Sequence, residues 1–251
     1  MTPQTHRIGM IVPSSNTTME TEIPELLRRQ QEHGRHRFSF HSARLRLQQV
    51  TPDALQRMNE SADGAVEALC DAQIDAIMYA CLVAVMYGGK PCISATRTRL
   101  AARAATPSGT PPVITSAGAL VTALRHLKAE RVTLLAPYRK ELTARVAATL
   151  ADCGIDVQSS RSLEVVDNLQ VGRLDPRKLL TIAAQMDLAG SQALVLSACV
   201  QMPSLGVIEE AEQRFGLPVI SAATASAFEL LHLLDIEPDI REAGSLLRSA
   251  R

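Results

Sequence analysis

The chain has 251 residues, and its 26 lysines and arginines are balanced by 26 aspartates and glutamates. A neutral chain without a basic run interleaved with aromatic residues does not predict binding to nucleic acid or to an anionic membrane surface. No stretch approaches the ~20 apolar residues of a membrane span, and the few apolar residues before Pro13 are too short for a signal-peptide core. These features predict a soluble, cytoplasmic protein.

The residues that bind metals and nucleotides are not arranged in known motifs. The five cysteines are an odd number and lack CxxC spacing, which argues against a disulfide framework and a zinc ribbon. The six histidines show no HExxH motif, and neither GxGxxG nor GxxxxGK[ST] occurs. We therefore expect no metal and no nucleotide cofactor.

Short apolar runs rich in Ile and Val alternate with longer helical patterns, which is typical of βαβ units around a mainly parallel sheet. In chain order the expected strands cover residues 7–12, 37–42, 75–80, 112–115, 131–136, 155–160, 193–198 and 218–221, with the patterns at 37–42 and 155–160 the weaker ones. The fold class is therefore predicted to be α/β.

The strands also repeat in kind and in order along the chain. RIGMIVP before residue 14 resembles RVTLLAP before residue 138, DAIMYAC resembles ALVLSAC, and PVITSAGA resembles PVISAATA. Colinear repeats of this kind are typical of a duplicated half. We predict two pseudo-symmetric α/β halves, one formed by residues 1–114 with 222–251 and one by residues 115–221, with a cleft between them.

Ligands of open α/β sheets bind at the carboxyl ends of the strands, so the residues after each strand are the candidates for a site. After the first strand, Thr17 and Glu20 fit a capping box that would begin a helix. The free amides of that helix start and the small polar residues from Ser14 to Thr18 could hold a carboxylate or a phosphate. A well-capped helix without a ligand is the alternative.

Cys81 and Cys199 each close a buried strand with the same Ala-Cys step, at matching places in the two halves. Pseudo-twofold symmetry would bring the two thiols to opposite walls of one cleft. A helix N-terminus nearby, marked for Cys199 by Pro203, could lower a thiol pKa and favour the reactive thiolate. The alternative is that both cysteines are inert, buried small side chains.

Other polar residues at strand ends allow a structural or a binding role. Tyr138 follows Pro137 in the second half, at the position equivalent to Ser14 in the first. Asp167-Asn168 could cap a turn or offer an amide to a ligand. Thr115-Ser116 and Ser221 are first of all expected as helix N-caps.

Several strings resemble maleate isomerases of the aspartate/glutamate racemase superfamily, and the resemblance runs nearly end to end. The strings are VPSSNTTMETEIP, YACLVAVM, ITSAGALV, APY, DNLQVGRLDP and LSACVQMPSL. The resemblance implies two α/β halves with the site between them, a homodimer, and catalysis without a cofactor on a small dicarboxylate, maleate. It places the nucleophile on Cys81, the acid/base on Cys199, and substrate binding on Asn16, Tyr138 and Asn168. We also expect Ser14, Ser15 and Val200 to bind the substrate.

The implied reaction is addition of a Cys81 thiolate to one alkene carbon while Cys199 protonates the other, followed by rotation about the single bond and elimination of fumarate. An amino-acid racemase would instead use both cysteines as acid/base, and an arylmalonate decarboxylase keeps a cysteine only in the second half. A non-enzymatic protein that binds small anions is the alternative from another class.

Overall fold

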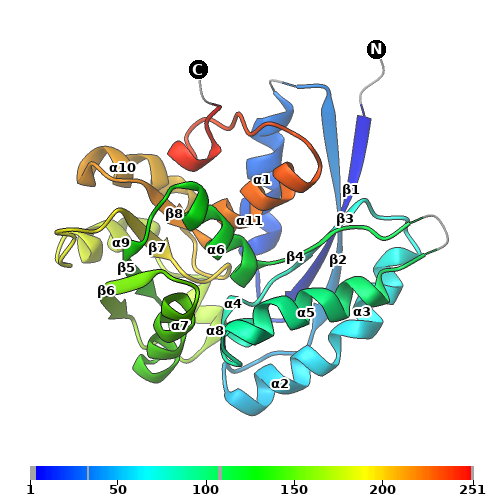
Figure 1. Cartoon of the computed structure of the whole chain (residues 1–251), viewed down its shortest axis with the longest axis horizontal. Helices are drawn as coiled ribbons and strands as arrows, with labels where there is room; N and C mark the ends of the chain where they lie inside the picture. Colours follow the sequence, from blue (N-terminus) through cyan, green and yellow to red (C-terminus); the bar gives the residue numbers. More distant parts are fainter. Residues whose placement is uncertain (1–3, 33, 107–108, 250–251) are drawn as a thin grey trace.

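A computed structural model of the chain describes residues 4–32, 34–106 and 109–249. Its strands form two four-stranded sheets in which every pairing is parallel (Figure 1). The first sheet has the order β2-β1-β3-β4 and the second the order β6-β5-β7-β8. The strands are β1 (Gln4–Pro13), β2 (His36–Leu45), β3 (Ala76–Tyr79), β4 (Val113–Thr115), β5 (Arg131–Ala136), β6 (Asp156–Ser162), β7 (Ala193–Ser197) and β8 (Val219–Ser221). The α/β class and all eight expected strands are confirmed.

Strand composition follows the burial of each strand. The inner strands β3, with sequence AIMY, and β7, with sequence ALVLS, are buried at every residue because helices cover both faces of a parallel sheet. The edge strands β2 and β6 carry polar residues and are largely half-exposed or exposed. The other two edge strands, β4 and β8, are buried at every residue. Burial therefore explains which strands are easily recognised in the sequence.

Helices connect the strands of each sheet. Those connecting the first sheet are α1 (Met19–Gln31), α2 (Pro52–Glu60), α3 (Ala62–Cys70), α4 (Leu82–Met86) and α5 (Lys90–Arg103). Those following β4 and connecting the second sheet are α6 (Ser116–His126), α7 (Lys140–Asp152), α8 (Asn168–Val171), α9 (Pro176–Ala183) and α10 (Ile208–Phe215), with a 3-10 turn η1 (Leu205–Val207) before α10. The chain then forms α11 (Ala222–Leu233) and a second 3-10 turn, η2 (Ser245–Leu247).

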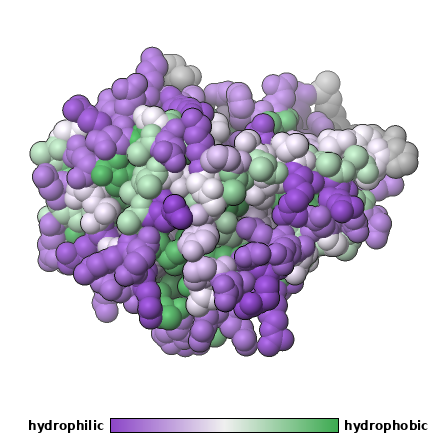
Figure 2. Space-filling model, turned by 60° about the horizontal axis from the view of Figure 1, so that its bottom comes forward, coloured by the Kyte–Doolittle hydropathy of each residue, from purple (hydrophilic) through white to green (hydrophobic). Residues whose placement is uncertain are grey.

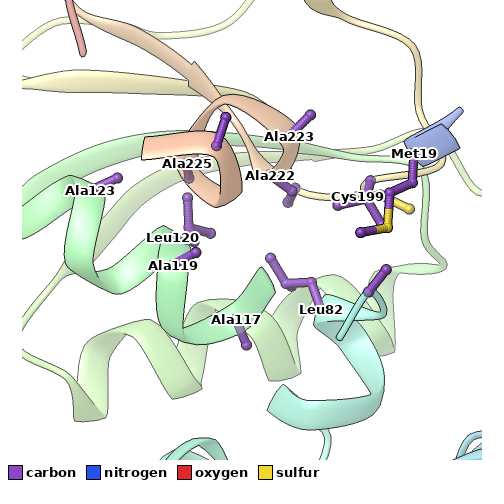
Figure 3. Packing of buried hydrophobic residues seen from close by; sticks show 14 of the residues in the cluster. Met19, Leu82, Ala117, Ala119, Leu120, Ala123, Cys199, Ala222, Ala223 and Ala225 are labelled. Carbon is purple, nitrogen blue, oxygen red and sulfur yellow. The ribbon is translucent and has the colours of Figure 1, made fainter. Parts of the chain in front are cut away.

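Helices α6 and α11 pack against each other where the two sheets meet (Figures 1 and 3). Each follows the last strand of its sheet, and each begins at an expected cap, Thr115 accepting from the Gly118 amide and Ser221 from the Thr224 amide. Alanines line both helices in Figure 3, which lets their backbones approach closely. Helix α11 also contacts α1 and β4, so the last helix covers the first sheet.

Within the described ranges, no helix is long and apolar enough to cross a membrane. The boundaries between the halves, 1–114 with 222–251 and 115–221, stay a prediction.

Candidate functional site

Two thiols lie just beyond the carboxyl ends of corresponding inner strands. Cys81 follows β3 and Cys199 follows β7, and their exposed fractions are only 7% and 8%. The two lie close enough that negative charge on Cys199 raises the pKa of Cys81. The structure therefore brings the two predicted thiols together at one place between the sheets.

Cys81 is the residue before α4, and the first turn of that helix folds around it. Its backbone N–H donates to the Ser116 hydroxyl at 3.4 Å, which ties the start of α4 to the start of α6. The Ala84 N–H contacts the sulfur and lowers its pKa, but burial is the larger effect and raises the pKa of Cys81 to about 12. The contact from Ala84 therefore does not offset the burial of the Cys81 sulfur.

Cys199 lies in a tight turn with more hydrogen-bond donors around its sulfur. Burial raises the pKa of this thiol, while the Tyr138 hydroxyl and the N–H groups of Gln201 and Met202 lower it. The Ser197 hydroxyl donates to the carbonyls of Cys199 at 2.9 Å and Met202 at 3.0 Å, which fixes the turn. A thiolate formed at Cys199 would therefore meet the N–H groups of Gln201 and Met202, and also the Tyr138 proton if that proton turns away from the Ala198 carbonyl.

Tyr138 is buried beside both thiols. Its hydroxyl donates to the Ala198 carbonyl at 3.0 Å and is a hydrogen-bond partner of Cys199. Burial and the nearby thiols Cys199 and Cys81 raise the pKa of the Tyr138 phenol well above its usual value, so the phenol stays neutral and keeps its proton.

The start of α1 is capped differently from the expected capping box. The Asn16 Oδ1 accepts from the N–H groups of Thr18 at 3.0 Å and Met19 at 2.9 Å, and the helix begins at Met19. The prediction that Thr17 and Glu20 form a capping box is wrong, because the Thr17 N–H donates to the Gln201 Oε1 and Glu20 pairs with Arg44. The Asn16 Nδ2 is buried without a hydrogen-bond partner, so the site holds an unused amide donor.

Asn168 comes from the second half and reaches the first. Asp167 caps α8 by accepting the Leu169 N–H at 2.9 Å, and this leaves the buried Asn168 side chain to donate to the Ser15 hydroxyl at 2.7 Å. The Ser15 hydroxyl donates onward to the Leu47 carbonyl.

Ser14 and Val200 complete the set of predicted residues. The Ser14 hydroxyl accepts the Leu47 N–H at 3.0 Å, so this residue and Ser15 hold the chain after β2. Val200 is buried in the turn between Cys199 and Gln201. Figure 3 shows Met19, at the start of α1, beside Cys199, and Leu82, at the start of α4, facing them.

Gln201 is a residue of the site that the sequence analysis missed. Its buried side chain makes hydrogen bonds with the backbone of Ser15, Thr17, Thr18 and Asn168. The sequence signal that could have indicated it is a long polar side chain among the mostly apolar residues of LSACVQMPSL, two residues after Cys199.

A surface groove of about 880 Å³ lies beside Ser15, and its lining also includes Asp167 and two arginines, Arg46 and Arg57. The two arginines favour the approach of an anion to this groove. Figure 2, which brings the lower face of Figure 1 forward, shows a strip of apolar side chains flanked by hydrophilic ones.

In the part of the chain that the structure describes, no three His, Cys, Asp or Glu side chains are grouped as metal ligands.

Comparison with known proteins gives one consistent result. Residues 8–247 match the arylmalonate decarboxylase family. The chain is 48% identical over 242 residues to a maleate isomerase of Geobacillus stearothermophilus, covering 96% of both chains. It is similar to the crystal structure of a cysteine-to-alanine variant of the maleate isomerase Iso from Pseudomonas putida S16 with maleate, with a TM-score of 0.96, 42% identity and coverage of 98% and 99%. A Nocardia farcinica maleate cis-trans isomerase variant with a covalently bound succinylcysteine intermediate has a TM-score of 0.94, 44% identity and coverage of 98% and 100%.

Proposed function

Since the chain belongs to the maleate isomerase family, we propose that it converts maleate into fumarate by reversible addition of a cysteine sulfur to the double bond. The observation that carries the proposal is the pair of buried thiols at the ends of β3 and β7, each close enough to influence the other. The succinylcysteine found in the Nocardia farcinica relative supports a covalent path.

In the proposed reaction, the Cys81 thiolate forms a carbon–sulfur bond to one alkene carbon as the neighbouring carbon takes the proton of the Cys199 thiol. The double bond becomes a single bond, about which the carboxylates rotate apart. The Cys199 thiolate then removes the proton, the double bond forms again, and Cys81 leaves as a thiolate. Protons and electrons balance without an added oxidant or reductant.

The unequal surroundings of the thiols support this division of roles. Cys199 carries negative charge in the intermediate, and the amides of Gln201 and Met202 stabilise that charge, joined by the Tyr138 hydroxyl when its proton turns from the Ala198 carbonyl to the sulfur. Cys81 has the single contact from Ala84, and a poorly stabilised thiolate is a stronger nucleophile. We therefore assign Cys81 as the nucleophile and Cys199 as the acid/base.

The carboxylates of maleate are assigned to neutral donors. The unpaired Asn16 Nδ2 is the clearest candidate, with Asn168, Tyr138 and the backbone at Val200 around it, while Ser14 and Ser15 shape the loop. Neutral donors suit a carboxylate that must swing during the reaction, because they do not fix it as a bidentate arginine would.

The direct test is to mix the protein with maleate and follow fumarate by proton NMR, without added metal or cofactor. We expect the vinyl signal of maleate to be replaced by that of fumarate. Unchanged maleate, with protein shown to be folded by circular dichroism, would overturn the proposed function.

We further propose that the enzyme is a homodimer and works in the cytoplasm. The mechanism needs two reduced thiols, and a reducing compartment maintains them. The assembly is tested by size-exclusion chromatography with light scattering, in which a mass near 27 kDa instead of twice that value would argue against the dimer.

A further inference from the structure

Gln201 is a glutamine that uses every hydrogen-bonding position of its side chain. Its Oε1 accepts from the N–H of Thr17 at 2.8 Å and of Thr18 at 3.3 Å. Its Nε2 donates to the carbonyl of Ser15 at 3.0 Å and of Asn168 at 2.9 Å. The residue is 1% exposed, so water does not replace any of these partners.

These contacts connect three segments that each carry a residue of the proposed site. Ser15, Thr17 and Thr18 surround Asn16, the Asn168 carbonyl belongs to a second carboxylate-binding candidate, and Gln201 itself follows Cys199 in the chain. The Thr18 hydroxyl also donates to the Gln201 carbonyl at 2.8 Å, which adds a second connection across the halves.

The Gln201 carboxamide is packed closely against Gly172. A methyl group added at Gly172 would lie 2.6 Å from the Gln201 Nε2 and 2.9 Å from the Thr17 hydroxyl. The chain after Asn168 therefore closes directly over the carboxamide, and glycine is needed for that close approach.

On this basis, and resting on the proposed function, we propose that Gln201 is a positioning residue, which holds the loop around Asn16, the Asn168 segment and the turn of Cys199 in register. It has no assigned contact with substrate. Gln201 keeps the amide donors of Asn16 and Asn168 at a fixed distance from the Cys199 thiol. The reaction depends on this geometry because its intermediate rotates before Cys199 removes the proton.

The first test is Gln201→Glu, which keeps the shape but replaces the Nε2 donor with an oxygen. That oxygen would face the carbonyls of Ser15 and Asn168, and only a protonated carboxyl could donate to either. We expect kcat/KM for maleate to fall at least tenfold at pH 8, with a higher KM, and the variant-to-wild-type ratio to recover at least threefold towards pH 6. A ratio independent of pH, or near one throughout, would overturn the proposal.

The matched control is Gln30→Glu. Gln30 is also a buried glutamine that bridges distant segments, donating to the Glu237 carbonyl at 2.9 Å and accepting the Asp239 N–H at 2.8 Å, but it lies between α1 and the C-terminal segment. We expect this variant to lose thermal stability while kcat and KM stay within twofold of wild type. An equal loss of activity in both variants would mean that Gln201 acts only through general stability.

A second variant, Gly172→Ala, keeps the Gln201 side chain and displaces it by contact. It should raise KM and lower kcat/KM in the same direction as Gln201→Glu, so the proposal stays testable if Gln201→Glu fails to fold. Unchanged kinetics of a folded Gly172→Ala protein would contradict the proposal.

One readout is independent of isomerase activity and separates this proposal from the proposed function. Iodoacetamide labelling at pH 8, resolved by peptide mass spectrometry, should be at least threefold slower at Cys199 in Gln201→Glu, because the turn donors lose their fixed position and a negative charge is added. Labelling of Cys81 should stay within twofold. If wild type proves inactive on maleate, the proposed function fails, while this labelling ratio still supports or overturns the positioning role.

Discussion

At the residue scale, the cysteines could be predicted from the sequence because they end repeated strands, a local and periodic signal. The role of Gln201 could not be predicted, because its partners Ser15 and Thr17 are more than 180 residues away along the chain. The direction of the Cys81 pKa also escaped prediction, because it depends on burial that no local pattern shows. Long-range contacts and desolvation are thus what the sequence alone did not reveal.

The different surroundings of the thiols predict which single variant accumulates an intermediate. In Cys199→Ser the proton acceptor for elimination is lost, so an adduct formed on Cys81 should break down slowly. We expect intact-mass spectrometry after maleate treatment to show a succinyl-sized increase, mapped to Cys81 by peptide analysis. Cys81→Ser is the matched control and should show no adduct; an adduct on Cys199 in that control would reverse the two roles.

Activity should rise with pH because Cys81 must be a thiolate to add. Its pKa is raised to about 12 by burial, so below that value each pH unit increases the thiolate fraction about tenfold. We expect kcat/KM to increase from pH 6.5 to pH 9, measured by the loss of maleate. A flat profile across this range would show that Cys81 is already ionised in the free enzyme, and a falling one would show that loss of the Cys199 proton limits the reaction.

At the element scale, the strands were predictable because buried parallel strands consist of short β-branched and aliphatic runs. The caps Thr115 and Ser221 were predictable as well, since capping depends on residues three positions apart. The start of α1 was not, because three residues, Asn16, Thr17 and Thr18, compete for the same free amides. Tertiary contacts from Gln201 and Arg44 settle that competition.

Helix α3 offers a substitution that should stabilise the fold. Gly64 is exposed within the helix, and a methyl group added there would meet no atom within 4 Å. Gly64→Ala should raise the free energy of unfolding by about 0.5–1 kcal/mol, because alanine restricts the unfolded chain more than glycine. Urea denaturation followed by circular dichroism measures the change.

The matched control for this substitution is Gly9→Ala in β1, where an added methyl group would lie 2.5 Å from the Ile74 Cδ1. We expect it to lower the free energy of unfolding by about 1–3 kcal/mol through overpacking. If both variants shifted stability in the same direction, the packing argument would be wrong.

At the scale of the whole molecule, the helices between the sheets contain a buried acid outside the proposed site. Glu229 on α11 is 6% exposed, with Thr122 as a hydrogen-bond partner at 3.5 Å, and its second oxygen has no partner. Burial raises the pKa of Glu229 to about 7, while Arg97 and Thr122 oppose that shift. The Glu229 carboxyl therefore loses its proton within the neutral pH range.

A group whose pKa is higher in the folded state stabilises the fold below its unfolded pKa, and this contribution is lost as pH rises through the folded value. Relative to Glu229→Gln, wild type should therefore lose about 1–3 kcal/mol of unfolding free energy between pH 4.5 and pH 8. Urea denaturation of both proteins at the two pH values measures the difference. A constant difference would show that Glu229 is solvated when charged.

The contact of α1 with the C-terminal segment can form only late in synthesis, after both segments have been made. Gln30 receives its hydrogen-bond partner Asp239 only after 209 further residues have been added. At ribosomal rates of about 5–20 residues per second, the nascent chain waits about 10–40 s between these events. Until α11 has been made, the surface of the first sheet that it covers is open to solvent and to chaperones.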